Sequence, residues 1–158
     1  MYIDELTPLF SDLCYNRNLE VAKLLLENSA DVHAVDNWAL HFRSEEGELE
    51  IVKLLLEYGA NVHADDDWAL QYASLNGHTE VIRLLLEKGA DVHANDDYAL
   101  RCASENGHTD TVRVLLENGA DVHYYDNMAL RYASRNGHTE IVELLQEHVG
   151  EQKGRLIT

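Results

Sequence analysis

The sequence of 158 residues has one proline, two cysteines and no long apolar run, and each shortage excludes a class of protein. Cys14 and Cys102 are too few for a disulfide framework or for a zinc site built on thiolates. No segment reaches the roughly 20 apolar residues of a membrane helix, and the acidic start at Met1–Glu5 lacks the basic region of a signal peptide. We therefore expect a soluble protein of the cytoplasm.

Basic residues are also scarce. Twelve Lys and Arg stand against 29 Asp and Glu, so the formal net charge is −17. A charge of this size repels nucleic-acid phosphates and anionic membranes, and we expect neither as a partner. Hydrophobic residues at 46% are typical of a globular protein, which argues against disorder of the whole chain.

A four-residue motif, Ala-Asp-Val-His, returns every thirty residues. Its copies stand at 30–33, 60–63, 90–93 and 120–123, with Asn61 in place of the aspartate in the second. An Ala-Leu pair returns at 39–40, 69–70, 99–100 and 129–130, and Asn-Gly-His-Thr returns at 76–79, 106–109 and 136–139. Self-similarity at a fixed period predicts a solenoid, because each unit is too small to bury its own apolar face.

Each unit is predicted to hold two short helices. In the best-defined unit the first helix runs from Tyr98 to about Asn106, with Asp97 as its N-cap, and Gly107 ends it. The second runs over 108–117 and is apolar on more than one side, so it must be covered by its neighbours. By position, the corresponding caps of the other units are Asn37, Asp67 and Asn127.

These motifs resemble the ankyrin repeat over residues 7–147. Gly89-Ala-Asp-Val92, Asn106-Gly-His108 and Val81-Ile-Arg-Leu-Leu-Leu86 match its pattern closely. The resemblance implies an all-α ankyrin-repeat solenoid of about five stacked helix-turn-helix units with short finger loops. We divide it into a single array over 1–147, with units at about 1–36, 37–66, 67–96, 97–126 and 127–147, the first and last serving as caps, and a tail at 148–158.

The units depart from the usual ankyrin pattern in two ways. They have thirty residues where ordinary units have 33, and the missing residues fall in the finger. A histidine also replaces the family's asparagine at positions 33, 63, 93 and 123. This shortened variant resembles the ankyrin proteins of mimivirus-type giant DNA viruses, which implies an effector that acts on host proteins in the host cell cytoplasm.

The histidines do not predict a metal site. Seven of the nine form two columns, 33/63/93/123 and 78/108/138, whose members lie about one helix spacing, roughly 10 Å, apart. Zinc requires ligands at about 2 Å, so we expect these histidines to bond loop backbone instead. The run Asp65–Asp67 lacks the glycine and the closing glutamate of an EF-hand loop. We expect no metal and no cofactor.

Catalytic motifs are missing as well. The sequence has no His-Glu-x-x-His, no phosphate-binding glycine-rich loop and no motif of a known nucleophile. A repeated unit also offers the same polar groups several times, whereas an active site is usually one unique cluster. We expect that the protein is not an enzyme.

The resemblance implies that a partner protein binds the finger tips and the inner face of the first helices. On that surface the candidate contact residues are Tyr98, Arg101, Tyr124, Tyr125, Met128, Arg131 and Arg135, with Trp38, His41 and Trp68 as a secondary apolar site. Three alternatives stay open. The tryptophans could belong to the core, the arginines could offset neighbouring acids, and the whole array could have a structural, self-associating role. A monomer is favoured over an oligomer because the end units are polar.

Overall fold

The computed structural model describes residues 18–28 and 31–155, and all regular structure in this part of the chain is helical. The helices are α2 (Leu19–Glu27), α3 (Ala34–Glu45), α4 (Leu49–Glu57), α5 (Ala64–Asn76), α6 (Thr79–Glu87), α7 (Ala94–Asn106), α8 (Thr109–Glu117), α9 (Tyr124–Asn136) and α10 (Thr139–Arg155). The prediction of an all-α fold is confirmed. Within the described segments, no helix is both long and apolar enough to cross a membrane.

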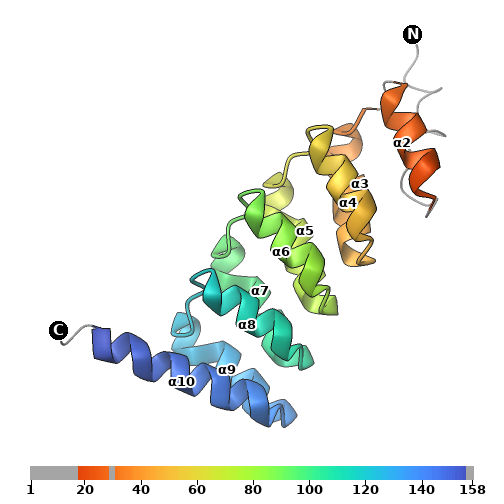
Figure 1. The fold of residues 1–158 in the computed structure, drawn as a ribbon. Helices are drawn as coiled ribbons and strands as arrows, with labels where there is room; N and C mark the ends of the chain where they lie inside the picture. Colours follow the sequence, from red (N-terminus) through yellow and green to blue (C-terminus); the bar gives the residue numbers. More distant parts are fainter. Residues whose placement is uncertain (1–17, 29–30, 156–158) are drawn as a thin grey trace.

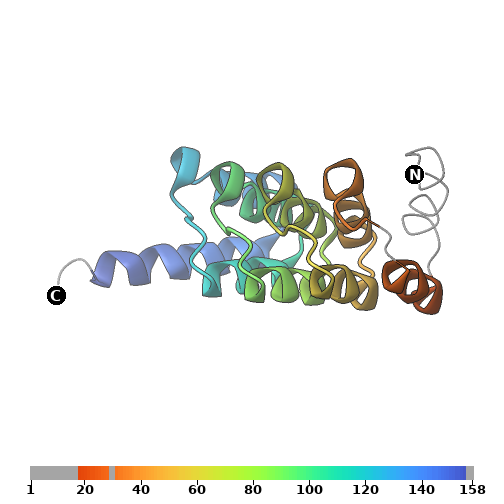
Figure 2. The same ribbon diagram turned by 90° about the horizontal axis from the view of Figure 1, so that it is seen from above.

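The helices form antiparallel pairs that stack into an elongated array of two layers (Figure 1). The first helices of the pairs, α3, α5, α7 and α9, lie in one layer, and α4, α6, α8 and α10 lie in the other (Figure 2). Each helix packs against its counterpart in the next pair as well as against its own partner. This arrangement confirms the predicted stack of helix pairs.

The core is a set of columns that run along the stack. Leu40, Leu70 and Leu100 of the first helices and Leu55, Leu85 and Leu115 of the second helices are at most 1% exposed. Complete burial of a leucine side chain stabilises a fold by about 1.5 to 3 kcal/mol. Since each leucine is covered partly by the neighbouring pair, the stability of one pair depends on the next.

The turn inside each pair joins two neighbouring pairs through a histidine. His108 Nε2 lies 2.9 Å from the backbone oxygen of Leu75, and His78 and His138 make the same contact with Glu45 and Glu105 at 2.8 and 3.0 Å. A carbonyl oxygen only accepts, so Nε2 carries the proton in each ring. For this column, the prediction that the histidines bond backbone is confirmed.

The fingers are short because three consecutive residues turn in the left-handed sense. These finger residues are 65–67, 95–97 and 125–127, and their φ angles lie between 45° and 63°. Left-handed backbone is costly for most side chains but tolerated by Asn and Asp, which fill eight of these nine positions. The acidic runs of the sequence are therefore a backbone requirement of the fingers.

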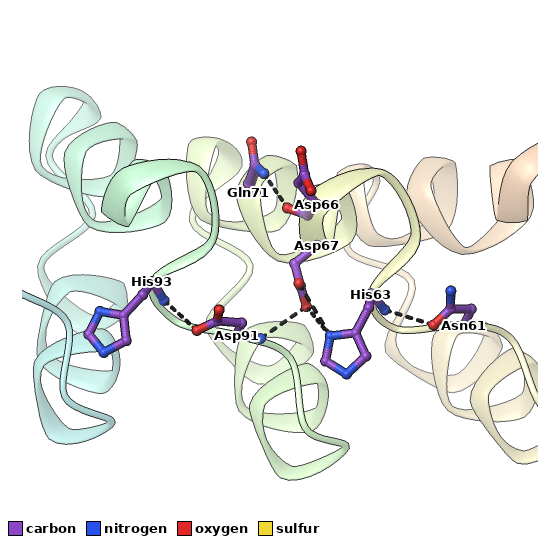
Figure 3. A network of polar contacts seen from close by, with 7 residues as sticks. All are labelled: Asn61, His63, Asp66, Asp67, Gln71, Asp91 and His93. Atoms are coloured by element: carbon purple, nitrogen blue, oxygen red, sulfur yellow. Dashed lines mark hydrogen bonds and ion pairs between the residues drawn. The ribbon is translucent and has the colours of Figure 1, made fainter.

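The last residue of each finger does not cap the following helix, so the predicted N-caps are wrong. Asp67 Oδ1 instead accepts a hydrogen bond from the Asp91 N–H of the next pair at 3.0 Å and lies 3.2 Å from His63 Nδ1 (Figure 3). Asp97 repeats both contacts with Asp121 and His93. The left-handed turn aims these side chains along the stack, so they tie adjacent pairs together.

The histidine column at 63, 93 and 123 also differs from expectation. Each Nδ1 faces the side chain four residues later, His93 at 3.1 Å from Asp97 and His123 at 3.1 Å from Asn127, and not loop backbone. The rings themselves stay exposed. They therefore hold the finger from outside and contribute little to the core.

The two ends of the array depart from the repeat. Near the start, Arg43 is fully buried and its Nη1 lies 2.9 Å from Glu48 Oε2, where the later pairs have alanine and histidine at these positions. At the other end, α10 continues to Arg155 and projects from the stack (Figure 2). The division of the chain into units and a tail stays a prediction.

Candidate partner-binding surface

The residue that follows each finger begins the right-handed part of the first helix, and this column carries large side chains. It holds Trp38, Trp68, Tyr98 and Met128. Trp38 is 36% exposed, and the other three are half-buried. The column therefore lies at the boundary between the core and the surface, directly below the finger tips.

At the N-terminal side the rings pack on one another. Trp38 and Trp68 meet edge to face with centroids 6.4 Å apart, and Trp68 meets Tyr72 at 4.9 Å. His41 lies 5.0 Å from Trp68 and is 6% exposed, so it supports that ring and presents little surface of its own. The tryptophans are neither wholly core residues nor free, because each ring covers its neighbour and keeps one part exposed.

Arg101 lies at the centre of the surface and joins two pairs. Its guanidinium is 5.1 Å from the centroid of Tyr98, Nη1 is 3.6 Å from the sulfur of Met128, and Nη2 donates to the Asn95 carbonyl at 3.3 Å. Three of the candidate contact residues, Tyr98, Arg101 and Met128, are thus brought together in one cluster.

Two tyrosines form the base and tip of the last finger. Tyr124 and Tyr125 meet edge to face at 5.0 Å, and Tyr125 is 60% exposed. The Tyr124 hydroxyl is hydrogen-bonded to Asp96, which raises the pKa of Tyr124 to about 12. Tyr124 is therefore protonated at neutral pH and acts as a hydrogen-bond donor that holds the last finger against the one before it.

A pocket of about 630 Å³ lies between α9 and α10 in the last helix pair. Its lining is formed by Met128, Leu130, Arg131, Tyr132, Ser134, Arg135, Val142 and Gln146. Arg131 and Arg135 are exposed there, and neither lies within 4 Å of a carboxylate in the described part of the chain. The pocket combines apolar walls with two available guanidinium groups.

Arginines of the second-helix layer, in contrast, lie close to carboxylates. Arg83 lies 3.9 Å from both Glu80 and Glu117, and Arg113 lies 4.0 Å from Glu140. On that outer face the arginines offset neighbouring acids. Arg131 and Arg135 of α9, in contrast, do not offset a neighbouring acid within the described residues.

Sequence reasoning missed two contributors to this surface, Phe42 and Tyr72. Phe42 stacks on Trp38 at 6.5 Å, as Tyr72 does edge to face on Trp68. Both stand four residues after a tryptophan, a spacing that places side chains on one helix face. The four-residue spacing is visible in the sequence. It does not show which face of the helix the rings share, because that face depends on the left-handed finger before the helix.

Metal binding has no support in the geometry of the described residues, where no three His, Cys, Asp or Glu side chains are grouped to hold an ion. The surface offers aromatic rings, guanidinium groups and exposed carboxylates. These groups can recognise another protein by packing, by charge and by hydrogen bonding.

The sequence matches a known protein family. A model described as ankyrin repeats, three copies, matches residues 10–96 and 93–155. No curated protein matches the chain. Ankyrin repeats are generally protein–protein interaction modules and are typically non-catalytic. Since the two matches cover nearly all of the stacked helix pairs, the chain belongs to the ankyrin repeat family.

Proposed function

We propose that this protein is a non-catalytic module that binds a partner protein through its fingers and first helices, chiefly at the C-terminal half of that surface. The proposal is carried by the backbone conformation and the exposure of Tyr125. Among the finger residues 65–67, 95–97 and 125–127, all of which have positive φ, it is the one that is neither Asp nor Asn, and it is 60% exposed.

Left-handed backbone does not favour a tyrosine at this position. Asp65 and Asn95 stand at the equivalent point of the two preceding fingers and suit left-handed backbone, which costs other side chains on the order of 1 kcal/mol. The exposed ring recovers little of that cost by burial. Tyr125 thus departs both from the residue preference of left-handed backbone and from the preference of aromatic rings for burial. A contact outside the chain best explains such a residue.

The neighbours of Tyr125 fit the same function. Tyr, Met and Arg are enriched at protein interfaces, and contacts of this kind carry most of the binding energy. The proposed contact set around Tyr125 consists of Tyr98, Arg101, Tyr124, Met128, Arg131 and Arg135, with Trp38 and Trp68 as an apolar extension that the buried His41 supports. The available guanidinium groups favour a partner with an acidic or mixed surface.

Binding can be tested with four baits of the full chain: the parent, Tyr125→Asn, Arg131→Glu and Arg113→Glu. Proteins retained from a cell extract by the parent and by Arg113→Glu should be lost from the other two. Arg113 lies on the second-helix layer, so it controls for the reversal of one charge. Equal retention by all four folded baits would show that the surface is wrongly assigned.

A narrower proposal concerns where the module acts. The thirty-residue repeat and the histidine column support a viral effector that acts on host proteins in the cytoplasm. This proposal rests on repeat length and on one column of residues. Expression of a tagged chain in a host amoeba, followed by fractionation, would test it; recovery of the tag in a fraction other than the cytosol would contradict it.

Self-association is a second candidate, favoured by two apolar residues of the last described helix pair. Leu130 and Val142 remain partly exposed, whereas their counterparts Leu100 and Val112 are fully buried by the next pair. A second copy could cover them. Light scattering over a range of concentrations distinguishes the two candidates, since the partner-binding module is expected to keep a monomer mass throughout.

A further inference from the structure

A second, open pocket of about 310 Å³ lies between the fingers of two adjacent pairs, away from the C-terminal pocket. Its lining residues are Asp65, Asp66, Trp68, Gln71, Tyr72, Asn95 and Tyr98. Three aromatic rings, from Trp68, Tyr72 and Tyr98, thus share one small space with two carboxylates at its rim. Trp68 and Tyr98 belong to the proposed contact set, but that set assigns no ligand to the pocket between them.

The carboxylates at the rim face solvent, and the backbone of Asp66 is held by a hydrogen bond. Asp65 is 51% exposed, and Asp66 is exposed as well. The Asp66 backbone oxygen accepts a hydrogen bond from Gln71 Nε2 at 2.5 Å, and Figure 3 shows the Asp66 and Gln71 side chains together at the tip of the finger, away from Asp67. The finger therefore presents negative charge above the rings.

Aromatic rings and carboxylates together favour one class of ligand. A ring face attracts a cation through its quadrupole, most strongly for tryptophan, and a carboxylate attracts the same cation by charge. The pocket is too small for a helix but has room for one side chain. A basic side chain satisfies both groups at once, whereas a neutral apolar side chain would leave the carboxylates without a partner.

The next pair shows how a cation is accommodated in this setting. The position of Gln71 corresponds to Arg101, whose guanidinium lies over the Tyr98 ring and donates to Asn95. Arg101 then continues toward Met128, in the direction away from Trp68. Arg101 thus supplies the Tyr98 ring with a cation from the chain itself, whereas Gln71 is neutral and supplies none to the Trp68 and Tyr72 rings.

Other cations of the described chain do not fill the pocket. His41 Nδ1 is 3.7 Å from Asp65 Oδ2, but its ring is 6% exposed, packs against Trp68 and is not part of the lining. Asp66 has no ion pair within the described residues. The rim therefore keeps an excess of negative charge.

We propose that this pocket binds one basic side chain, an arginine or a lysine, of a partner protein. The proposal rests on the proposed function only for the source of the cation. It adds a cation-binding site at the N-terminal half of the surface to the acidic or mixed contact expected at Arg131. The partner would thus present a basic residue and an acidic region to the two halves of one surface.

The site can be tested with a short peptide that contains one arginine between glycines and serines, blocked at both ends. The peptide is titrated into the isotope-labelled full chain at physiological salt, which screens the long-range field of the acidic protein. We expect saturable NMR shifts at the Trp68 indole and at the amides of 65–72 and 95–98. The same peptide with citrulline, which is neutral and of the same shape, should produce none.

Two variants separate the rings from the carboxylates. Asp66→Asn keeps a side chain suited to left-handed backbone, and Trp68→Met adopts the residue found at the same position in the last pair, Met128. Each should weaken peptide binding about two- to fivefold, as expected for loss of one exposed cation contact. Asp126→Asn removes the same charge from the last finger and should leave binding unchanged.

Three results would overturn the proposal. Equal binding of the arginine and citrulline peptides would show that charge plays no part. Equal weakening by Asp66→Asn and Asp126→Asn would show that only the net charge of the chain is sensed. Shifts centred outside the pocket would place the site elsewhere. Tyr125→Asn and Arg131→Glu should bind the peptide like the parent, so failure of the proposed function is recognised separately.

Discussion

The ring of His108 lies directly against Gly77 of the preceding pair, so closely that a Cβ on this glycine would come within 2.5 Å of His108 Nδ1. The same ring reaches the Leu75 carbonyl through Nε2. Asn-Gly-His looks like one motif in the sequence, but its glycine and histidine act on different neighbours. Each histidine needs the glycine of the pair before it.

Gly77→Ala should therefore destabilise the array more than Gly137→Ala. Both glycines have positive φ, +75° and +78°, so left-handed strain of about 1 kcal/mol applies to both. Of the two, Gly77 has a histidine against it, and displacing that ring loses a partly buried hydrogen bond worth about 1 kcal/mol more. Urea denaturation measures the difference, and equal losses would mean that the ring moves aside freely.

Asp67→Ala should cost more stability than Asp66→Ala, although both residues occupy the same finger in the same left-handed conformation. Asp67 is 5% exposed and accepts from the Asp91 N–H, whereas Asp66 is exposed. Loss of a hydrogen bond to a charged group costs about 1.5 to 3 kcal/mol. Asp67→Asn should be nearly neutral, because Asn37 accepts the equivalent bond at 2.8 Å. If Asp67→Ala matched Asp66→Ala in thermal melts, the tie between pairs would carry no stability.

Leu85→Ala in the middle of the stack should lower the free energy of unfolding by about 2 to 5 kcal/mol, the range for deletion of a buried leucine. Leu85 is fully buried, whereas Gln146 in the last helix is exposed. Gln146→Ala should therefore change stability by about 0.5 kcal/mol or less. Chemical denaturation compares the two, and equal effects would contradict a stack in which each pair covers the next.

Cys102 should be inert toward thiol reagents in the folded protein. It is 5% exposed, and burial raises the pKa of its thiol, so little reactive thiolate forms at pH 8. In a Cys14→Ser background, which leaves a single thiol, labelling should be slow until denaturant is added. Rapid labelling of the folded chain would show that α7 opens readily toward solvent.

Most of the fold could be predicted from the sequence, but only part of the candidate surface could. The leucine columns and the Gly-His turns repeat in register, so their positions in the helix pairs follow from local pattern. The placement of Asp67 and Asp97 was mispredicted as helix capping. Nothing local distinguishes a side chain that caps its own helix from one that reaches the next pair, since Asp suits both positions.

What the sequence determined by itself is the repeated frame: the thirty-residue period, the buried leucines and the glycines that end each first helix, because these depend on short-range sterics and on apolar periodicity. The tertiary structure decided which residues of neighbouring helix pairs contact one another. Left-handed fingers turned Asp67 toward Asp91, placed Trp68, Tyr72 and Tyr98 around one pocket, and left Arg131 without an acid within the described residues. Those relationships depend on the stacking distance and on the direction of the fingers, which no single repeat contains.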